Sequence, residues 1–489
     1  MTDTEGFALA LLVTSSAALT AVLLNRLTER TRIPTPLLIL VGAAAVAGVV
    51  PADLLPNVVT VENVVTVALV LILFDGGMHI GFRRFRAAAL PVASVGLLGT
   101  FLTAAAGAVL LHLAFGIDWY LAVLVATAVA PTDPAVVFSV LGQRQIRGRS
   151  GTILEGESGA NDPVGIALMA GLLAAGGLSW QLAGEVATTF VLQMVVGAAV
   201  GVLGGWGMLW FTRKVPLPNE ALYPLRSVFC AIALYGIATV AHGSGFLAVF
   251  IAGILLGDPG APYKREIERF HSALASFGEI VAFLVLGLTV NLTVVARPDV
   301  WIPGLVLGLG LALVIRPLAA GLCLLPARLR PNELTFILFA GLKGAVPILL
   351  GEFLRAAQVP DAERLYGIVV VVVTFSVLAQ GSLVPAVVRM LKLPSRTTEL
   401  EPWALGVRLR EEPDGVHRLR VAAGSPADGT TIRDLADRVG DMWVSIVVRD
   451  AQLVTVRDET RLRAGDDVVV LADPELNEEL LAEFSPSPD

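Results

Sequence analysis

The sequence predicts an all-α polytopic membrane protein that carries a small α/β domain at its C-terminal end. Of its 489 residues, 55% are hydrophobic and 16% are charged, whereas soluble domains contain about 25% charged residues. Apolar stretches recur from Gly6 to about Leu391, and most of them are long enough to cross a bilayer as a helix. They are continuous, whereas a membrane β-barrel would show short alternating segments. We therefore expect the lipid bilayer, and no nucleic acid, as a partner.

The apolar stretches predict about thirteen transmembrane helices. They cover about residues 5–25, 35–51, 61–81, 87–113, 118–141, 157–177, 183–212, 227–241, 244–257, 272–291, 301–326, 334–354 and 366–390. The two cysteines, Cys230 and Cys323, lie inside such stretches, so we expect neither a disulfide nor a metal site from them.

Basic residues gather in every second connection between these spans. These connections carry Arg26, Arg30, Arg32, Arg83, Arg84, Arg86, Arg144, Arg147, Arg149, Arg213, Lys214, Arg226, Lys264, Arg265, Arg269, Arg328 and Arg330. The opposite connections carry only Arg297, Arg355 and Arg364. The positive-inside rule then places the N-terminus outside and the C-terminal domain in the cytoplasm. We expect a multi-pass protein of the inner (plasma) membrane.

Two of the predicted spans are interrupted. Pro131 and Pro134 break the span 118–141, and a glycine-rich segment, 341–347, breaks the span 334–354. Interrupted spans at matching positions of two halves indicate a transporter with its site near the middle of the membrane. Spans one to six and eight to thirteen are therefore expected to form an inverted repeat with two crossing broken helices.

The composition changes after Leu391, which divides the chain into regions. We assign a transmembrane domain to 1–392, a linker to 393–403 and a cytoplasmic domain to 404–489. In the last region we expect strands at 443–448 and 468–471, a helix at 474–484 and turns at 424–429 and 463–467. We interpret this domain of roughly 80 residues as a regulatory module. The alternative is a tail that only stabilises the protein.

The span 157–177 carries the strongest signal for chemistry. Glu157, Ser158, Asn161 and Asp162 are spaced so that a helix presents them on one face. They offer oxygen atoms, which group-one cations need in place of water. A carboxylate in a bilayer costs about 2.5–3.5 kcal/mol and marks a functional site. Asp162 can hold either a cation or a proton, and this competition suffices for exchange; the alternative is a polar stripe that packs against another helix.

The broken span 118–141 is expected to supply the facing half of the site. The prolines free backbone carbonyls around Thr132 and Asp133, and such carbonyls can coordinate a cation. Asp133 can also cap the following half-helix and offset the positive dipole of its crossing partner. The alternative for Asp133 is a purely structural N-cap.

Two cations, Arg316 and Lys343, lie well inside apolar spans and need compensation. We expect Glu157 to pair with Arg316, which leaves Asp162 free, and Lys343 to balance the C-terminal dipoles of half-helices.

Three further acidic residues are weaker candidates. Asp75 is expected to pack beside glycines, and the alternative is an accessory site. We expect Glu155 to be solvated just before its span, and Glu279 remains without a role.

Taken together, these motifs resemble the monovalent cation:proton antiporters of the NhaP/NHE type, over about residues 5–392. The motifs are Thr132-Asp133-Pro134, Gly156-Glu157-Ser158 with Asn161-Asp162, Arg316-Pro317 and Gly341-Leu342-Lys343-Gly344-Ala345. The resemblance implies an inverted-repeat fold, a homodimer and elevator-like alternating access. It implies that Asp162 is the exchange carboxylate and that Thr132, Asp133 and Ser158 bind or frame the cation. Asn161 would support the site, and Asp162, Ser158 and Thr132 would be the ligands of K+ or Na+.

An Asn-Asp pair is similar to the electroneutral branch of this family, with one cation exchanged per proton. The family usually has arginine where Lys343 stands, and lysine loses the forked geometry. The tail resembles a TrkA-C (RCK_C) ligand-binding domain around 424–429, 444–450 and 465–466. This resemblance implies that the domain binds a small-molecule ligand. It also favours potassium/proton exchange of the cell-volume-regulation type. We expect pH homeostasis as a role and no resident cofactor.

Three other classes of protein compete with this interpretation. A sodium-selective antiporter would have the same motifs. A cation channel would need a selectivity filter, and the sequence shows none. An intramembrane protease would need a Gly-x-Gly-Asp motif, which the sequence lacks. We therefore expect a transporter and not an enzyme.

Overall fold

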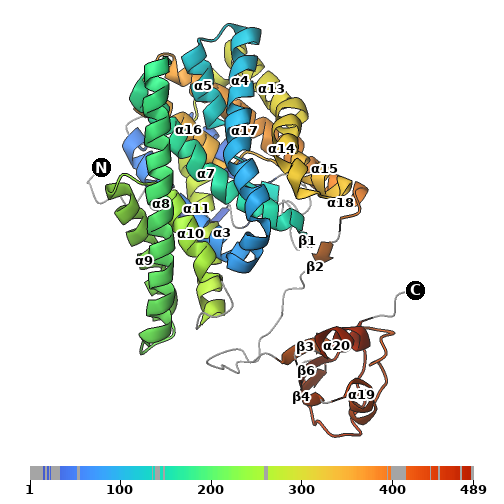
Figure 1. The fold of residues 1–489 in the computed structure, drawn as a ribbon. Coiled ribbons are helices and arrows are strands. Elements are labelled where there is room, and N and C mark those ends of the chain that lie inside the picture. The colour runs from blue at the N-terminus through green and yellow to red at the C-terminus, as the bar shows by residue number, and fades with distance from the viewer. Residues whose placement is uncertain are drawn as a thin grey trace. The chain divides into compact units, whose positions relative to one another are not determined.

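The computed structural model describes residues 15–16, 19–20, 23, 34–51, 55–134, 136–137, 144–146, 149–257, 263–393, 395–397, 415–440, 442–449, 452–473 and 476–485. The chain divides into two compact units, Met1–Glu401 and Pro402–Asp489 (Figure 1). Most of the predicted span 5–25 and of the linker 393–403 lies outside the described residues.

The first unit is almost entirely helical. Its α-helices are α2 (Thr35–Ala47), α3 (Val58–Ala93), α4 (Thr100–Phe115), α5 (Trp119–Ala128), α7 (Arg149–Ala175), α8 (Trp180–Lys214), α9 (Leu222–Val240), α10 (Gly245–Leu256), α11 (Lys264–Leu288), α12 (Leu292–Val295), α13 (Pro298–Gly310), α14 (Arg316–Leu324), α15 (Pro331–Phe339), α16 (Ala345–Ala356), α17 (Ala362–Phe375) and α18 (Ser382–Met390). Wider π-helical turns, η2 (Ser94–Gly99), η3 (Leu311–Ile315) and η5 (Ser376–Gly381), and one 3₁₀ turn, η4 (Leu325–Ala327), continue some of them. In the described part, 6 helical stretches are long and apolar enough to cross a membrane. The predicted helical membrane protein is confirmed.

Two boundaries differ from the prediction. The basic segment around Arg84, expected as a loop, is helical, and α3 turns instead at Gly81, whose φ is 65°. Glycine adopts this left-handed conformation without steric cost, so one residue replaces the loop. The expectation that Glu155 precedes its span was also wrong: α7 begins at Arg149, and Glu155 is a half-buried residue within it. Hydropathy marks only the apolar part of a helix and missed its polar first turns.

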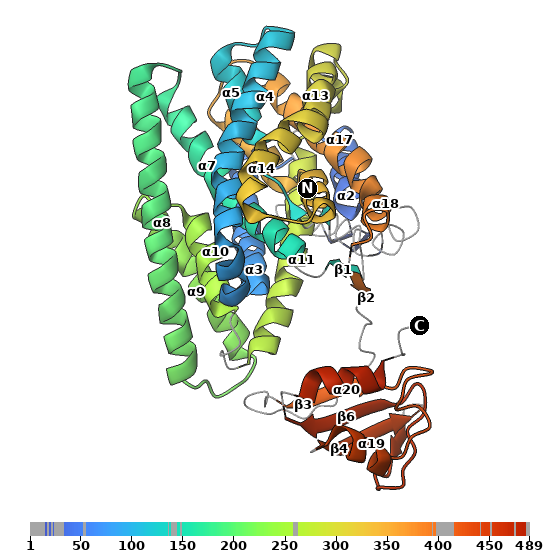
Figure 2. The same ribbon diagram turned by 45° about the vertical axis from the view of Figure 1, so that its right-hand side comes forward.

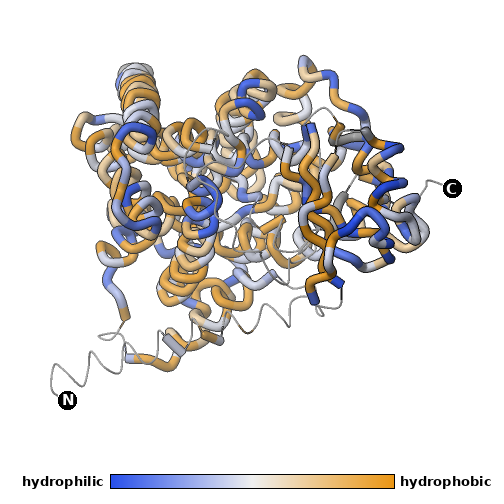
Figure 3. The backbone as a smooth tube through the Cα atoms, turned by 90° about the horizontal axis from the view of Figure 1, so that it is seen from below, coloured by the Kyte–Doolittle hydropathy of each residue, from blue (hydrophilic) through white to orange (hydrophobic). Residues whose placement is uncertain are grey.

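The helices of the first unit surround a central pair of elements that carry the candidate site. Helices α8, α9 and α10 lie on one side and α13, α14 and α17 on the other, with α7 and α16 between them (Figures 1 and 2). Hydrophobic residues, in orange, predominate along much of the helical backbone (Figure 3). Large apolar side chains face outward on α8, where Trp206 is 63% exposed, as lipid contact requires. Burial between helices therefore places α7 and α16 away from lipid.

A short strand pair closes the first unit near its C-terminal end. Strand β1 (Arg144–Ile146) pairs antiparallel with β2 (Ser395–Thr397), and Gln145 lies opposite Arg396. Strand β1 belongs to the connection between the first broken span and α7, and β2 follows α18. The pair therefore links the chain leading to the second unit with the connection that follows the first helix break.

The second unit is a small α/β domain, as predicted. Its antiparallel sheet has the order β3-β6-β4-β5. The elements are β3 (Val416–Arg420), α19 (Ile432–Val439), β4 (Met442–Arg449), β5 (Gln452–Val454), β6 (Asp467–Ala472) and α20 (Asn477–Phe484). Leu435 of α19 and Leu480 of α20 are fully buried with Val447 and Val470 of the sheet, so alternate strand residues supply one face of this core.

Candidate functional site

The breaks in the two interrupted spans meet each other. Helix α5 ends at Ala128, and α16 begins at Ala345, after α15 has ended at Phe339. The backbone N–H of Asp133 donates to the carbonyl oxygen of Leu342 at 2.8 Å. Prolines and glycines interrupt the regular helix bonds here, so each broken segment satisfies some of its backbone groups through the other.

Helix α7 contacts the first break through two of its polar side chains. The Asn161 amide Nδ2 donates to Thr132 Oγ1 at 2.8 Å, and Thr132 Oγ1 donates to Glu157 Oε1 at 3.3 Å. Glu157, Asn161 and Thr132 are all buried. The structure thus brings together residues 132, 157 and 161, which the helical spacing had placed on facing elements.

Glu157 forms a buried ion pair with Arg316 at the start of α14. Arg316 Nη1 and Nη2 donate to the two carboxylate oxygens at 2.7 and 3.1 Å. Arg316 also donates to the carbonyl oxygens of Leu338 and Ile337, both at 3.1 Å. The charge of Glu157 is therefore balanced by a two-pronged partner, as a buried carboxylate requires.

Lys343, in the second break, lies at the C-terminal end of α5. Its ammonium Nζ donates to the carbonyl oxygens of Ala130 and Pro131 at 2.9 and 3.0 Å. The side chain is only 3% exposed. Carbonyl groups at a helix C-terminus carry partial negative charge, and a cation placed there is stabilised.

Asp162 is held differently from Glu157, although both belong to α7. It is buried, with 7% of its surface exposed. Within the part of the chain that the structure describes, its carboxylate accepts no hydrogen bond, and its charged neighbours are Asp133 and Lys343. Ser158, one turn earlier on the same helix, is equally buried. A buried carboxylate without protein partners needs a cation or a proton to compensate its charge.

Two glycines of the second break allow the charged groups to approach its backbone. A Cβ atom on Gly341 would overlap the guanidinium of Arg316, and one on Gly344 would overlap the carboxylate of Asp133. Asp133 therefore lies against the first turn of α16, where the helix dipole favours a negative charge. Glycines are needed on both sides of Lys343 because Arg316 approaches the backbone on one side and Asp133 on the other.

Sequence reasoning left two groups of buried polar residues without a role. Ser376 and Gln380 on η5 are 4% and 6% exposed and bond to the second break. Their signal in the sequence was a pair of polar residues, one helical turn apart, inside an apolar span. Glu279 of α11 has its Oε1 buried without a hydrogen-bond partner among the described residues.

Asp75 of α3 contacts α11. It accepts a hydrogen bond from Ser272 Oγ at 3.1 Å, and His79 Nδ1 lies 3.4 Å from its carboxylate. Its surroundings are therefore polar side chains, and the expected packing beside glycines describes only part of them.

This arrangement defines a membrane transporter with two crossing interrupted helices. The family model described as "Sodium/hydrogen exchanger, transmembrane" matches residues 15–390, and the TrkA-C domain model matches residues 416–485. The chain therefore belongs to the sodium/hydrogen exchanger family and carries a TrkA-C domain. Both predicted resemblances are confirmed.

Named relatives and a solved structure agree with this assignment. The K(+)/H(+) antiporter NhaP of Alkalimonas amylolytica is 34% identical over 419 residues, which cover 83% of this chain and 71% of that protein. The K(+)/H(+) antiporter NhaP2 of Shewanella oneidensis is 32% identical and covers 97% of this chain and 83% of its own length. The sodium proton antiporter MjNhaP1 of Methanocaldococcus jannaschii has a TM-score of 0.67 at 21% identity, covers 78% of this chain and 100% of its own, and shows the shared fold.

Proposed function

We propose that this protein exchanges a monovalent cation for a proton across the membrane, and that both compete for Asp162. The observation that carries the proposal is the contrast between the two carboxylates of α7. Glu157 is bound to Arg316, whereas Asp162 is buried and accepts no hydrogen bond from the described residues. Only the second carboxylate is free to change its partner in each transport cycle.

The surrounding oxygen atoms suit a cation that has lost part of its water. Asp162 would bind it directly, Ser158 and Thr132 would add hydroxyl oxygens, and Asp133 would add a second negative charge nearby. Asn161 would hold Thr132 through the bond described above. When the cation leaves, a proton neutralises Asp162. Because one positive charge replaces another, we propose an electroneutral cycle of alternating access.

We propose K+ as the transported cation. Relatives named K(+)/H(+) antiporters align with both the transmembrane part and the tail, covering up to 98% of this chain. Na+ is the second candidate, because a protein named Na(+)/H(+) antiporter NhaH from Halobacillus aidingensis is 27% identical over 68% of this chain.

We further propose a homodimer in the inner (plasma) membrane, with the N-terminus outside and the TrkA-C domain in the cytoplasm. The uneven distribution of basic residues supports this orientation. The protein would need no resident cofactor, and it would move ions rather than convert a substrate. The TrkA-C domain would bind an unidentified small molecule.

The function is tested with purified protein in vesicles that contain a pH-sensitive dye. Adding K+, and in a separate run Na+, to the outside should release protons from inside for the transported cation. Asp162→Asn should abolish this signal, whereas Asp361→Asn, which changes an exposed aspartate at the start of α17, should leave it intact. Full activity of Asp162→Asn would refute the assignment, and cation flux without proton counterflow would indicate a channel.

We propose that the tail regulates exchange through the linker. The strand pair β1–β2 supports this, since it ties the chain entering the tail to the connection after the first break. Deleting residues 400–489 should change the pH or ligand response and keep exchange. Gln145→Cys combined with Arg396→Cys, at two positions whose Cα atoms are paired across the strands, should form a disulfide. With this disulfide, the response of exchange to pH or ligand should no longer change when the tail is deleted. Loss of all transport in the deletion would instead make the tail structural.

A further inference from the structure

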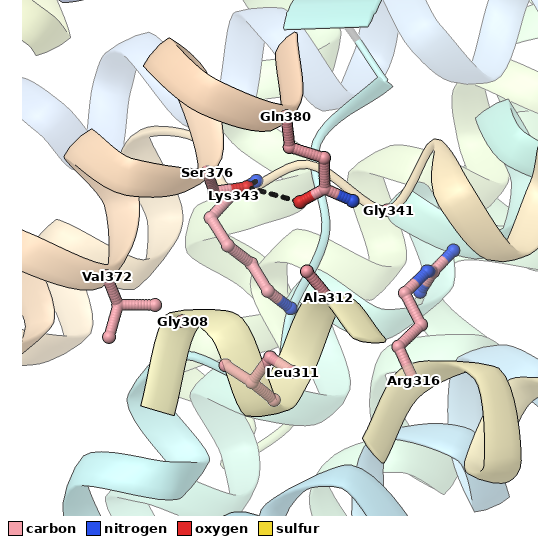
Figure 4. Close-up of a pocket in the computed structure, with 9 residues that line it drawn as sticks. All are labelled: Gly308, Leu311, Ala312, Arg316, Gly341, Lys343, Val372, Ser376 and Gln380. Carbon is pink, nitrogen blue, oxygen red and sulfur yellow. Dashed lines mark hydrogen bonds between the residues drawn. The ribbon is translucent and has the colours of Figure 1, made fainter. Parts of the chain in front are cut away.

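The last transmembrane segment holds the second helix break with a chain of three hydrogen bonds. Gln380 Nε2 donates to the carbonyl oxygen of Phe339, the last residue of α15. Ser376 Oγ donates to Gln380 Oε1 at 3.3 Å, and the backbone N–H of Lys343 donates to Ser376 Oγ at 3.1 Å. The chain thus runs from Phe339, on one side of the break, to Lys343; Figure 4 shows its central bond, between Ser376 and Gln380.

Resting on the proposed function, we propose that Ser376 and Gln380 are positioning residues for cation exchange. They fix the backbone at Lys343, so that its ammonium reaches the carbonyl oxygens of Ala130 and Pro131. Neither residue touches Asp162. They act through Lys343, whose ammonium bonds to the carbonyl oxygen of Pro131, next to Thr132, which in turn bonds to Asn161 beside Asp162.

The geometry separates the two ends of Lys343. Its backbone N–H is bound to Ser376, while its side chain extends away from the Ser376–Gln380 bond in Figure 4. Its Nζ bonds at the far end to the two carbonyl oxygens at 2.9 and 3.0 Å. A flexible four-carbon side chain delivers its charge to a defined point only when its backbone is fixed. The hydrogen bonds from η5 provide this fixed point.

Two features of the surroundings make Ser376 and Gln380 the residues able to do this. Both lie on the π-helical turn η5, whose wider geometry is common at functional sites. A cavity of about 10 Å³ lies among Lys343, Ser376, Gln380 and Arg316, close to the smallest space that holds a water molecule. In the intact protein these two side chains satisfy the backbone N–H of Lys343 and the carbonyl oxygen of Phe339, so removing either side chain costs a buried backbone group its hydrogen bond.

The loss of these hydrogen bonds should change the apparent KM for the cation and not only the stability of the protein. If the backbone at residue 343 moves, the Lys343 ammonium no longer holds the carbonyl oxygens of Ala130 and Pro131 in place, and the affinity of the neighbouring site for the cation changes. A purely structural role would lower expression or the melting temperature and leave the apparent KM and the pH profile of exchange unchanged.

The test compares three variants of the full-length protein in vesicles, with K+ as the probe. Ser376→Ala removes the hydroxyl, and Ser376→Thr keeps it. Ser382→Ala removes a control hydroxyl which, among the described residues, bonds to the carbonyl oxygens of Leu378 and Ala379 in the preceding turn. We expect Ser376→Ala to change the apparent KM for K+ about fivefold, equivalent to about 1 kcal/mol. Ser376→Thr and Ser382→Ala should stay within about twofold of the unmodified protein.

The same substitution in a Lys343 variant tests whether Ser376 acts through Lys343. In a Lys343→Met protein, Ser376→Ala should add less than about twofold, because residues that act through one another are not additive. An unchanged KM and pH profile in Ser376→Ala, or the same fivefold change in both backgrounds, would overturn the proposal. If Ser376→Ala does not fold, Gln380→Glu, which loses the donor to Phe339, takes its place with the same expectations.

The proposal remains testable if exchange itself is not observed. Ligand binding raises the melting temperature of the protein that binds it, so the K+ concentration for half-maximal stabilisation can be measured in detergent. A protein that binds K+ but does not exchange it would refute the proposed function. The positioning role would then be judged by whether Ser376→Ala shifts that concentration about fivefold or leaves it unchanged.

Discussion

The ion pair between Glu157 and Arg316 allows the two carboxylates of α7 to be separated by experiment. Glu157→Gln keeps the size of the side chain and one oxygen acceptor but removes the negative charge. Arg316, which is 6% exposed, then remains as a buried cation without its partner. We expect this variant to lose stability rather than the capacity for exchange.

The size of the effect follows from the contacts of Arg316. It forms two hydrogen bonds to Glu157, at 2.7 and 3.1 Å, and two to backbone carbonyls, both at 3.1 Å. Removing one partner of a buried ion pair costs about 3–5 kcal/mol. Because the carbonyls and the new amide oxygen still accept hydrogen bonds, we expect the lower end, about 3 kcal/mol.

The loss is measured as the melting temperature of purified protein in detergent, alongside exchange in vesicles. Glu185→Gln changes an exposed glutamate of α8 and should leave both quantities unchanged. Combining Glu157→Gln with Arg316→Met removes the buried charge altogether and should recover part of the stability.

One result would refute this reasoning. If Glu157→Gln melts like the unmodified protein and yet does not exchange ions, Glu157 belongs to the transport site and not to a structural pair. If the variant with both Glu157→Gln and Arg316→Met regains stability but does not exchange ions, Glu157 likewise belongs to the transport site.

Three further outcomes follow from the site. Ser158→Ala should keep the melting temperature, because Ser158 has no hydrogen-bond partner among the described residues. It should raise the apparent KM for K+ about threefold to tenfold in the vesicle assay. An unchanged KM would exclude Ser158 as a ligand of the cation. Gly344→Ala should abolish exchange, because its Cβ would overlap the Asp133 carboxylate, and wild-type activity would show that this contact is not required. Lys343→Met should lower the free energy of unfolding by about 1–3 kcal/mol for each carbonyl that loses its donor. The measurement is the melting temperature, compared with that of a control, Lys392→Met, at an exposed lysine. Equal melting temperatures would contradict the hydrogen bonds described for Lys343.

The transmembrane pattern could be predicted from the sequence because it depends on local properties. A run of apolar residues specifies a membrane helix by its length and composition alone, and proline and glycine interrupt a helix at their own positions. The helical period likewise places Glu157 and Asp162 on one face of α7 before any packing is known. Only some helix ends were misplaced. At Arg149 polar residues extend α7 beyond its apolar part, and at Gly81 a single glycine turns α3 where a loop was expected.

The partners of these residues were decided by the tertiary structure, because they join distant parts of the chain. Arg316 lies 159 positions from Glu157, and Lys343 lies 213 positions from Ala130. The charge of Arg316 demanded a carboxylate, so its pairing could be expected from the sequence. Nothing local indicated that Ser376 and Gln380 bind the second break. A polar side chain in an apolar span shows that a partner exists, and only the packing of one helix against another decides which backbone group it reaches.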